Sequence, residues 1–195
     1  MTRTATVARK TGETNIQITV DLDGTGKTNI QSGVGFFDHM LTAFGRHSLI
    51  DLSVRCEGDT WVDDHHTVED VGIALGDALR QALGDKRGIR RFADVAVPLD
   101  EALVLAAVDI SGRGELYWDV DIAPDKVGTF DTELGQEFFI GLARNAGLTL
   151  HLRKLCGTNA HHILEATFKA CARALRVACE SDPRVDDVPS TKGVL

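Results

Sequence analysis

The sequence predicts a mixed α/β protein of the α+β type, built from an internally duplicated ββαβα unit with sheets packed against helices. The main observation is a His-His-x-x-Glu motif that occurs twice, at residues 65–69 and 161–165. Alternating apolar and polar residues, typical of strands, stand upstream of each motif. Apolar residues at helical spacing follow each motif. We expect the sheets on one side of the molecule and the helices on the other.

Sliding the chain along itself aligns residues that are rare elsewhere. Slides of 88, 96 and 98 residues align, in turn, Gly24-Thr25-Gly26 with Gly112-Arg113-Gly114, His65, His66 and Glu69 with His161, His162 and Glu165, and His39 with Glu137. Small loop insertions explain why the offset drifts. We therefore predict a first repeat half over residues 1–92 and a second over residues 93–195.

The first half reads as strands and helices in a simple order. Residues 14–22 alternate apolar and polar side chains, and Asp23 to Gly26 is a turn signal before another extended run from Lys27. These two runs are predicted to form a hairpin. The remaining elements follow: a short helix over 36–44 that ends near 45–47, a strand over 49–56, and a helix from His65 to about Gly84. A basic segment, residues 86–91, closes this half.

The second half is expected to repeat this plan and to end in a polar tail. The tail after Glu180 contains Pro183 and Pro189 and closes with Pro189-Ser190-Thr191-Lys192-Gly193-Val194-Leu195. Fraying of the chain end is the simplest interpretation of such a segment.

Charge and hydropathy exclude several classes of protein. The formal net charge of -8 argues against a nucleic-acid surface, although a local basic pocket for a small anion is compatible with it. No apolar run reaches the length of a membrane span, and the N-terminus lacks the apolar core of a secretory signal. A cytoplasmic protein is the expectation.

The two His-His motifs are candidate metal-binding sites. Each follows a capping residue, Asp63 or Asp64 in one case and Thr158 or Asn159 in the other, so each motif is predicted to open a helix. The first His and the Glu of each motif are then i,i+4 neighbours on one helix face, close enough to bind a single ion. The second His, turned by about 100°, is free to bind another ion.

The repeat extends this ligand set from six residues to eight. His39 and Glu137 occupy equivalent positions on equivalent predicted helices. Pseudo-symmetry then gives each of two metals one i,i+4 His/Glu pair, one second His from the opposite motif, and either His39 or Glu137. Imidazole and carboxylate ligands without thiolate suit Mn, Fe or Co with open positions for substrate, and zinc is an alternative that usually takes fewer ligands.

Five motifs together resemble the imidazoleglycerol-phosphate dehydratase family over nearly the whole chain: Arg9-Lys10-Thr11-Gly12-Glu13-Thr14, Phe37-Asp38-His39-Met40-Leu41, Asp64-His65-His66-Thr67-Val68-Glu69-Asp70, His161-His162-Ile163-Leu164-Glu165-Ala166 and Pro189-Ser190-Thr191-Lys192-Gly193. The resemblance implies a duplicated α/β fold and conversion of imidazole glycerol phosphate to imidazole acetol phosphate and water in histidine biosynthesis. It also implies two Mn²⁺ ions per active site and a homo-oligomer of 24 subunits with sites at subunit interfaces.

The resemblance also implies two ligand sets. One metal would take His65, Glu69, His162 and residue 137, and the other His39, His66, His161 and Glu165. This chain departs from the family pattern at one of these positions, because Glu137 stands where the family has His.

The resemblance also implies roles for residues that bind no metal. The C–H bond that breaks has no adjacent carbonyl to acidify it, so metal ions on the imidazole ring would stabilise the developing charge. Glu13 is the candidate general acid/base, and Glu101, its partner in the repeat, is interpreted as a vestige. The phosphate of the substrate is expected to bind Arg91, Arg113, Ser190 and Lys192, with Lys169 near the metals.

Two other readings compete with this one. Asp21-Leu22-Asp23-Gly24-Thr25 matches the nucleophile motif of haloacid-dehalogenase-type phosphatases, a fold that needs a helix and a parallel crossover next. In the other reading the protein is no enzyme, and the His-His motifs only join subunits through metals. Open coordination positions and turnover separate this reading from a dehydratase.

Overall fold

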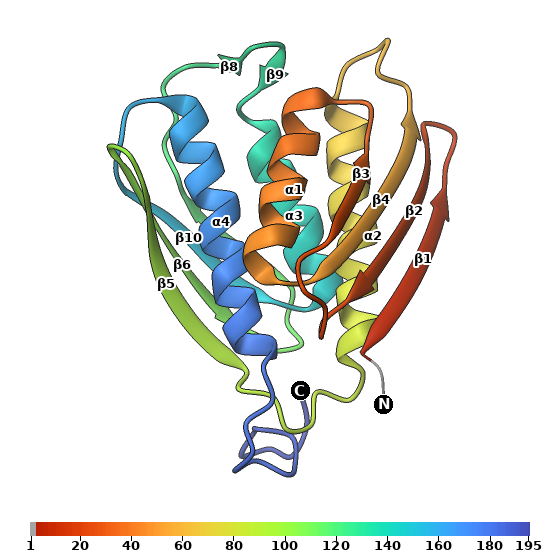
Figure 1. Ribbon diagram of the computed structural model, residues 1–195, viewed down its shortest axis with the longest axis vertical. Coiled ribbons are helices and arrows are strands. Elements are labelled where there is room, and N and C mark those ends of the chain that lie inside the picture. The colour runs from red at the N-terminus through yellow and green to blue at the C-terminus, as the bar shows by residue number, and fades with distance from the viewer. Residues whose placement is uncertain (1–2) are drawn as a thin grey trace.

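The computed structural model describes residues 3–195 and places four helices between two four-stranded sheets (Figure 1). The expected arrangement of sheets on one side and helices on the other is therefore wrong for the whole molecule. It holds only within each half, because the halves pack together through their helices. The elements of the first half are β1 Thr4–Lys10, β2 Thr14–Asp21, β3 Thr28–Gln31, α1 Gly35–Ser48, β4 Asp51–Gly58 and α2 His65–Leu83.

The second half has the same order of elements with one insertion. Its elements are β5 Phe92–Leu99, β6 Ala102–Asp109, β7 Glu115–Asp119, the short hairpin strands β8 Lys126–Val127 and β9 Phe130–Asp131, α3 Leu134–Ala146, β10 Thr149–Cys156 and α4 Ala160–Cys179. The predicted boundary at residues 92 and 93 falls at the start of β5.

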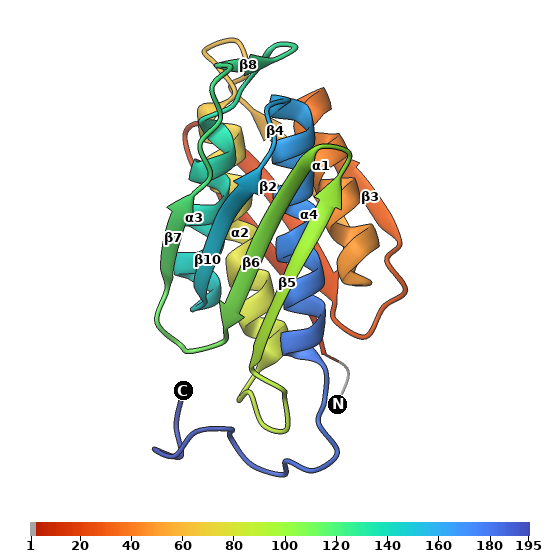
Figure 2. The ribbon, with the colours of Figure 1, turned by 90° about the vertical axis from the view of Figure 1, so that its left-hand side faces the viewer.

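The two large sheets have matching topologies. Their strand orders are β1-β2-β4-β3 and β5-β6-β10-β7, so each strand has a counterpart at the same place in the other sheet. In both sheets the first three strands pair antiparallel with one another, and the last strand runs parallel to the third. Figure 2 shows the second sheet face on. The shared strand order and strand directions support duplication of one unit.

The helices join the two halves. α2 packs on α3 and α1 packs on α4, and a single apolar core runs through both halves. The α2–α3 contact is close enough that backbone meets backbone: a Cβ atom at Gly72 would lie 2.5 Å from the carbonyl oxygen of Phe138, and one at Gly76 would lie 2.7 Å from that of Leu142. Gly141 plays the same part on α3. Glycine is therefore required along this seam.

Each large sheet contains one strand more than predicted, because β1 in the first half and β5 in the second precede the strands that the sequence pattern identified. The inward positions of β1 are Ala5, Val7 and Arg9, which are only partly buried. Arg9 forms an ion pair of 2.5 Å with the buried Asp70 of α2. A charged residue at an inward position weakens the apolar alternation by which a strand is recognised.

The predicted hairpin between residues 14–22 and the run from Lys27 is also wrong. β4 lies between β2 and β3, and β3 pairs with β4 in parallel. The carboxylate of Asp51, at the start of β4, accepts hydrogen bonds from the amides of Thr25 and Lys27 at 2.7 and 2.8 Å. The turn is thus fastened to β4, which keeps β3 away from β2.

This topology also rules out the phosphatase alternative. No helix follows β2 before the next strand, whereas that fold needs a helix there. Asp23, the second aspartate of the motif, forms an ion pair with Arg3.

The tail is folded back rather than frayed. Ile89 and Ser181 form a β-bridge, the amide of Gly88 donates to the carbonyl of Asp187 at 2.9 Å, and the Arg91 guanidinium donates to the carbonyl of Pro189 at 2.8 Å. The basic segment 86–91 is thus the platform on which the tail rests.

Between residues 3 and 195, none of the helices combines the length and the hydropathy needed to cross a lipid bilayer.

Candidate metal centre and anion pocket

All four helices begin at the same end of the molecule, and the two His-His motifs lie there (Figure 1). The side chain of Asn159 accepts a hydrogen bond from the amide of His162 at 3.2 Å and so caps α4, as predicted. At the start of α2 the carboxylate of Asp63 accepts from the amide of His65 at 2.8 Å. These local bonds fix where each motif enters its helix.

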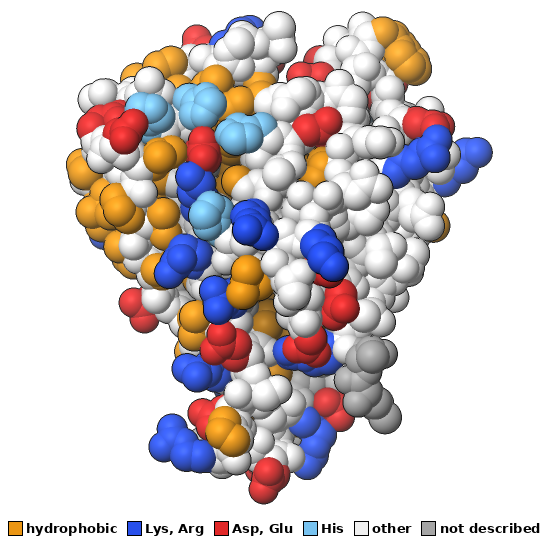
Figure 3. All heavy atoms as spheres, viewed as in Figure 1, with side chains coloured by type: hydrophobic (Ala, Val, Ile, Leu, Met, Phe, Trp, Pro, Cys, Tyr) orange, Lys and Arg blue, Asp and Glu red, His pale blue; other side chains and the backbone are white. Residues whose placement is uncertain are grey.

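Three of the predicted ligands converge between α1 and α4. The Nε2 atoms of His39 and His161 lie 3.3 and 3.1 Å from the same carboxylate oxygen, Oε2 of Glu165. Ligand atoms of the three residues all lie within 4.8 Å of one another. Histidine side chains gather on this face of the molecule, over α1 and α4 (Figure 3). Two imidazole nitrogens and a carboxylate oxygen suit a divalent transition metal.

The ionised form of Glu165 is favoured. Burial alone would raise the pKa of this carboxyl, but the Lys169 ammonium, 2.6 Å from Oε1, together with His161 and His39, holds the pKa below its ordinary value. An ionised carboxylate is the form that binds a metal.

Aromatic side chains support the same cluster. The ring of Phe36 meets that of His161 edge to face, with 5.3 Å between the ring centroids. Phe130 of the inserted β8–β9 hairpin packs on Phe36, with 5.1 Å between the ring centroids. These contacts hold the His161 ring in place.

The pseudo-symmetric cluster on α2 and α3 is less complete. Nε2 of His65 and Oε2 of Glu69 lie 4.0 Å apart on one face of α2, as the i,i+4 spacing predicts. Glu137 is half-buried on α3, the helix that packs on α2. Within residues 3–195, however, the trio on α1 and α4 is the one group whose ligand atoms converge within 4.8 Å, so Glu137 stands apart from His65 and Glu69.

The second histidine of each motif points elsewhere, as its position on the helix predicts. Nδ1 of His66 lies 3.0 Å from a carboxylate oxygen of Asp59, and Nδ1 of His162 lies 2.7 Å from one of Glu101. These hydrogen bonds raise the pKa of both histidines. A carboxylate on Nδ1 directs Nε2 outward, which is the usual support of a metal-binding histidine.

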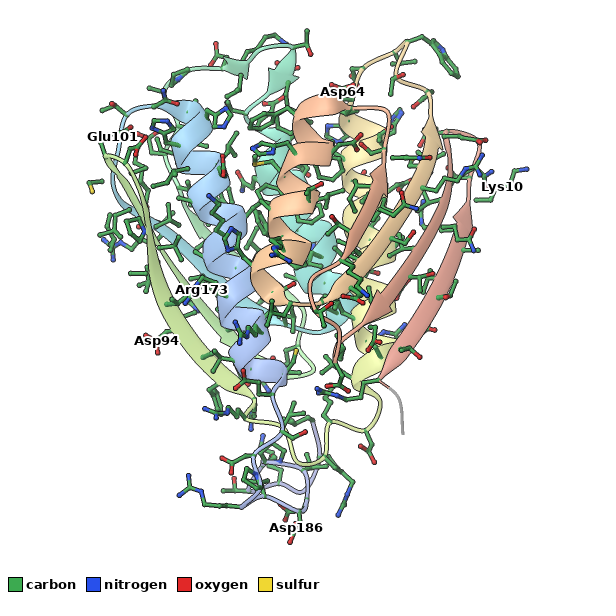
Figure 4. The ribbon with its side chains drawn as sticks, viewed as in Figure 1. Lys10, Asp64, Asp94, Glu101, Arg173 and Asp186 are labelled. Atoms are coloured by element: carbon green, nitrogen blue, oxygen red, sulfur yellow. The ribbon has the colours of Figure 1, made fainter. Side chains whose placement is uncertain are left out.

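Glu101 therefore has a role of its own and is not a vestige. It lies at the turn between β5 and β6, beside the start of α4 (Figure 4). Its other carboxylate oxygen, Oε1, accepts hydrogen bonds from the backbone amides of Thr158 and Asn159 at 3.2 and 2.8 Å. The hydrogen bond with His162, followed by that with the Asn159 amide, lowers the pKa of Glu101 to about 2.

Glu13 lies just before β2, at the end of the molecule where the His-His motifs lie. Its Oε1 atom is 3.6 Å from Nε2 of His66, and its backbone carbonyl accepts the amide of Asp59 at 3.1 Å. The carboxylate is exposed and stands next to the free nitrogen of a predicted ligand. This is a suitable position for a group that exchanges protons with a molecule bound there.

Four of the predicted anion-binding residues line one cavity of about 920 Å³ under the tail: Arg91, Arg113, Ser190 and Lys192. The Arg91 guanidinium donates to both carboxylate oxygens of Asp109, at 2.7 and 3.2 Å, and to the tail carbonyl of Pro189. Arg113 is largely exposed and has only a long contact of 3.8 Å with Asp109. Lys169 lies apart from this cavity, beside Glu165.

The candidate ligands His39, His161 and Glu165 lie near the start of α4, and the cavity under the tail lies beyond its end. His161 is in the first turn of this helix of 20 residues, and the tail starts after its last turn. At 1.5 Å per residue the helix spans about 30 Å. A small molecule cannot contact both regions of one chain at once.

Sequence reasoning missed Asp59 and Phe36, and misread Glu101. Asp59 and Glu101 support equivalent histidines from non-equivalent places in the repeat. The alignment of the halves therefore gave no signal for Asp59, and it paired Glu101 with Glu13 without showing the contact with His162. Phe36 precedes the Phe37-Asp38-His39 motif, but its contact with His161 depends on how α1 and α4 pack.

Comparison with known proteins gives a consistent result. The family model described as "Imidazoleglycerol-phosphate dehydratase" matches residues 32–175. Curated proteins of that name from Granulibacter bethesdensis and Dinoroseobacter shibae are 60% and 61% identical over 196 and 194 residues, covering 100% and 99% of this chain and 100% of each relative.

Solved structures agree. The Staphylococcus aureus imidazoleglycerol-phosphate dehydratase has a TM-score of 0.84 at 40% identity, over 92% of this chain and 99% of that one. The structure of IGPD from Pyrococcus furiosus in complex with (S)-C348 also has a TM-score of 0.84, at 41% identity, over 97% of this chain and 100% of that one. The predicted fold class is confirmed, and the purely structural alternative is wrong, because these relatives are enzymes. The chain belongs to the imidazoleglycerol-phosphate dehydratase family.

Proposed function

We propose that this chain converts imidazole glycerol phosphate to imidazole acetol phosphate and water, as a step of histidine biosynthesis. The convergence of His39, His161 and Glu165 carries the proposal, since it provides the metal ligands that this dehydration needs. Family membership supports the same activity. The four cysteines are unpaired, as is usual for proteins of the cytoplasm, where we place the reaction.

Two Mn²⁺ ions are proposed per active site. One would be held by His39, His66, His161 and Glu165, and the other by His65, Glu69, Glu137 and His162. The donor set of imidazole nitrogens and carboxylates fits Mn²⁺, and no cysteine is in either set. The hydrogen bonds from Asp59 and Glu101 support His66 and His162 as ligands through Nε2.

Metal ions held by these residues would bind the imidazole ring of the substrate and would stabilise the negative charge that the ring gains when the proton is removed from carbon. Glu13, beside His66, accepts the proton from carbon or donates one to the departing hydroxide. Arg113, Ser190 and Lys192 bind the phosphate, while Arg91 fixes the tail through Pro189 and Asp109. Lys169 keeps Glu165 ionised.

The active site is proposed to be shared between copies of this chain in a homo-oligomer of 24 subunits. The length of α4 separates the anion cavity from the metal cluster of the same chain by about 30 Å. His66 and His162 also lie outside the cluster within residues 3–195. A tail from one copy next to the metal cluster of another would complete the site.

Metal removal tests the function. Complete chelation should abolish dehydration of imidazole glycerol phosphate and reduce the particle size in light scattering, since ions shared between subunits stabilise the assembly. Mn²⁺ should restore both, whereas Mg²⁺, which prefers oxygen ligands, should not. Full activity of a protein shown to be metal-free by elemental analysis would refute the metal-dependent mechanism.

Replacing Glu13 with Gln removes the proton-transferring carboxylate and keeps its shape. Turnover should fall by roughly 10²-fold or more, with substrate binding and metal content unchanged. Glu57→Gln, an exposed glutamate of β4 paired with Arg55, serves as the matched control and should leave turnover near normal. Near-normal turnover in Glu13→Gln would exclude the role.

Mixing two defective variants tests the shared site. His161→Ala should be inactive because it lacks a metal ligand, and Lys192→Glu because it repels phosphate. After joint dissociation and reassembly with Mn²⁺, up to about one quarter of the sites should combine an intact metal cluster with an intact tail. Activity should then reappear in the mixture, whereas two defects in the site of a single chain could not complement each other.

Glu137 should bind metal although the family position is usually His. Glu137→Ala should lower occupancy at one of the two metal sites, and Glu137→His should restore it. Glu133→Ala, one turn earlier on the exposed start of α3, is the control. Titration of metal-free protein measures this, and two-site binding at wild-type affinity in Glu137→Ala would show that the residue is no ligand.

A further inference from the structure

The loop between β4 and α2 carries the most exposed large apolar side chain among residues 3–195, that of Trp61. Trp61 is 84% exposed and the adjacent Val62 is 61% exposed. The loop rises at the end of the molecule where all four helices begin (Figure 1). Exposed tryptophan is rare enough on a free surface, and effective enough in interfaces, that a paired Trp and Val points to a partner.

The loop is held in a defined conformation. The amide of Val62 donates to the carbonyl of Asp59 at 2.8 Å, which closes a turn around Trp61. Asp59 is buried, and its carboxylate accepts from His66. On the other side Asp63 accepts the amide of His65. Because both sides of the tip are fastened, Trp61 is presented outward at little entropic cost to binding.

The corresponding loop of the second half has no such feature. It consists of Gly157, Thr158 and Asn159, between β10 and α4, whereas the first-half loop runs from Asp59 to Asp64. Both loops bring a side-chain acceptor to the start of their helix, and the longer one also carries Asp59, which accepts from His66. The side chains of Trp61 and Val62 take no part in these contacts and lie outside the apolar core.

The position of the loop favours a second copy of this chain as the partner. His65 and His66 stand at the start of α2, just after this loop, and their side chains are 42% and 34% exposed. Neither histidine belongs to a complete ligand group within residues 3–195. A copy that supplies the missing groups to these histidines must approach the surface on which Trp61 stands.

We propose that Trp61 and Val62 are the apolar anchor of the interface through which a second copy of this chain completes the metal site at His65 and His66. The proposal rests on the shared active site of the proposed function. It assigns to this loop a task that neither the metals nor the substrate requires.

Fluorescence of Trp61 tests the proposal. The chain has two tryptophans, and Trp118→Phe leaves Trp61 as the sole reporter. In dissociated, metal-free subunits its emission should be that of a water-exposed indole and should be quenched readily by acrylamide. On assembly with Mn²⁺ the emission should shift to shorter wavelength and the quenching should fall.

A second measurement uses variants of the loop itself. Trp61→Ser should leave the far-ultraviolet circular dichroism of the subunit unchanged, because the side chain touches little of its own chain, yet require a roughly tenfold or higher protein concentration for half-assembly. Trp61→Phe should recover most of this loss. Thr60→Ala, an exposed neighbour on the same loop, is the matched control and should assemble like the wild type.

The outcomes separate this inference from the proposed function. If the wild type is active, Mn²⁺-dependent and assembled while Trp61 stays exposed and Trp61→Ser assembles normally, the anchor is refuted and the function stands. Burial of Trp61 only when substrate is added would also refute it and would assign the loop to the substrate. If chelation affects neither activity nor assembly, the proposed function fails first.

Discussion

The packing of α1 on α4 and of α2 on α3 is the constraint on which the rest of this structure depends. Each pair takes one helix from each half, so neither half can bury its helices alone. The same pairing brings His39 of the first half to His161 and Glu165 of the second. The duplicated chain thus brings together three candidate metal ligands from two different halves.

The candidate ligands could be chosen from the sequence, whereas their arrangement in space could not be predicted from it. His65 with Glu69 and His161 with Glu165 could be paired because i,i+4 spacing is a local property of a helix. The position of β3 could not be predicted, since it depends on hydrogen bonds to Asp51, far along the chain. The strand β1 was missed because its inward Arg9 is neutralised by Asp70, which only the fold brings near.

A chain of net charge -8 can still attract an anion because its charges are segregated. Asp109 accepts the Arg91 guanidinium in a two-point contact, so much of that positive charge is neutralised within the protein. Arg91 adopts a left-handed backbone conformation with φ of 70°, held by its amide bonding to Ala178 at 2.9 Å. The positive charge under the tail that is least compensated therefore belongs to Lys192 and to Arg113, whose contact with Asp109 is long, at 3.8 Å.

The glycine seam between α2 and α3 limits how this gene can vary. Every base substitution that changes the amino acid encoded by a glycine codon adds a side chain, and at Gly72 or Gly76 its first carbon would collide with the backbone of α3. Neighbouring side chains can adjust to a new atom, whereas a packed helix backbone has little freedom to move. Purifying selection should consequently act strongly on these two codons, although neither glycine belongs to the candidate site.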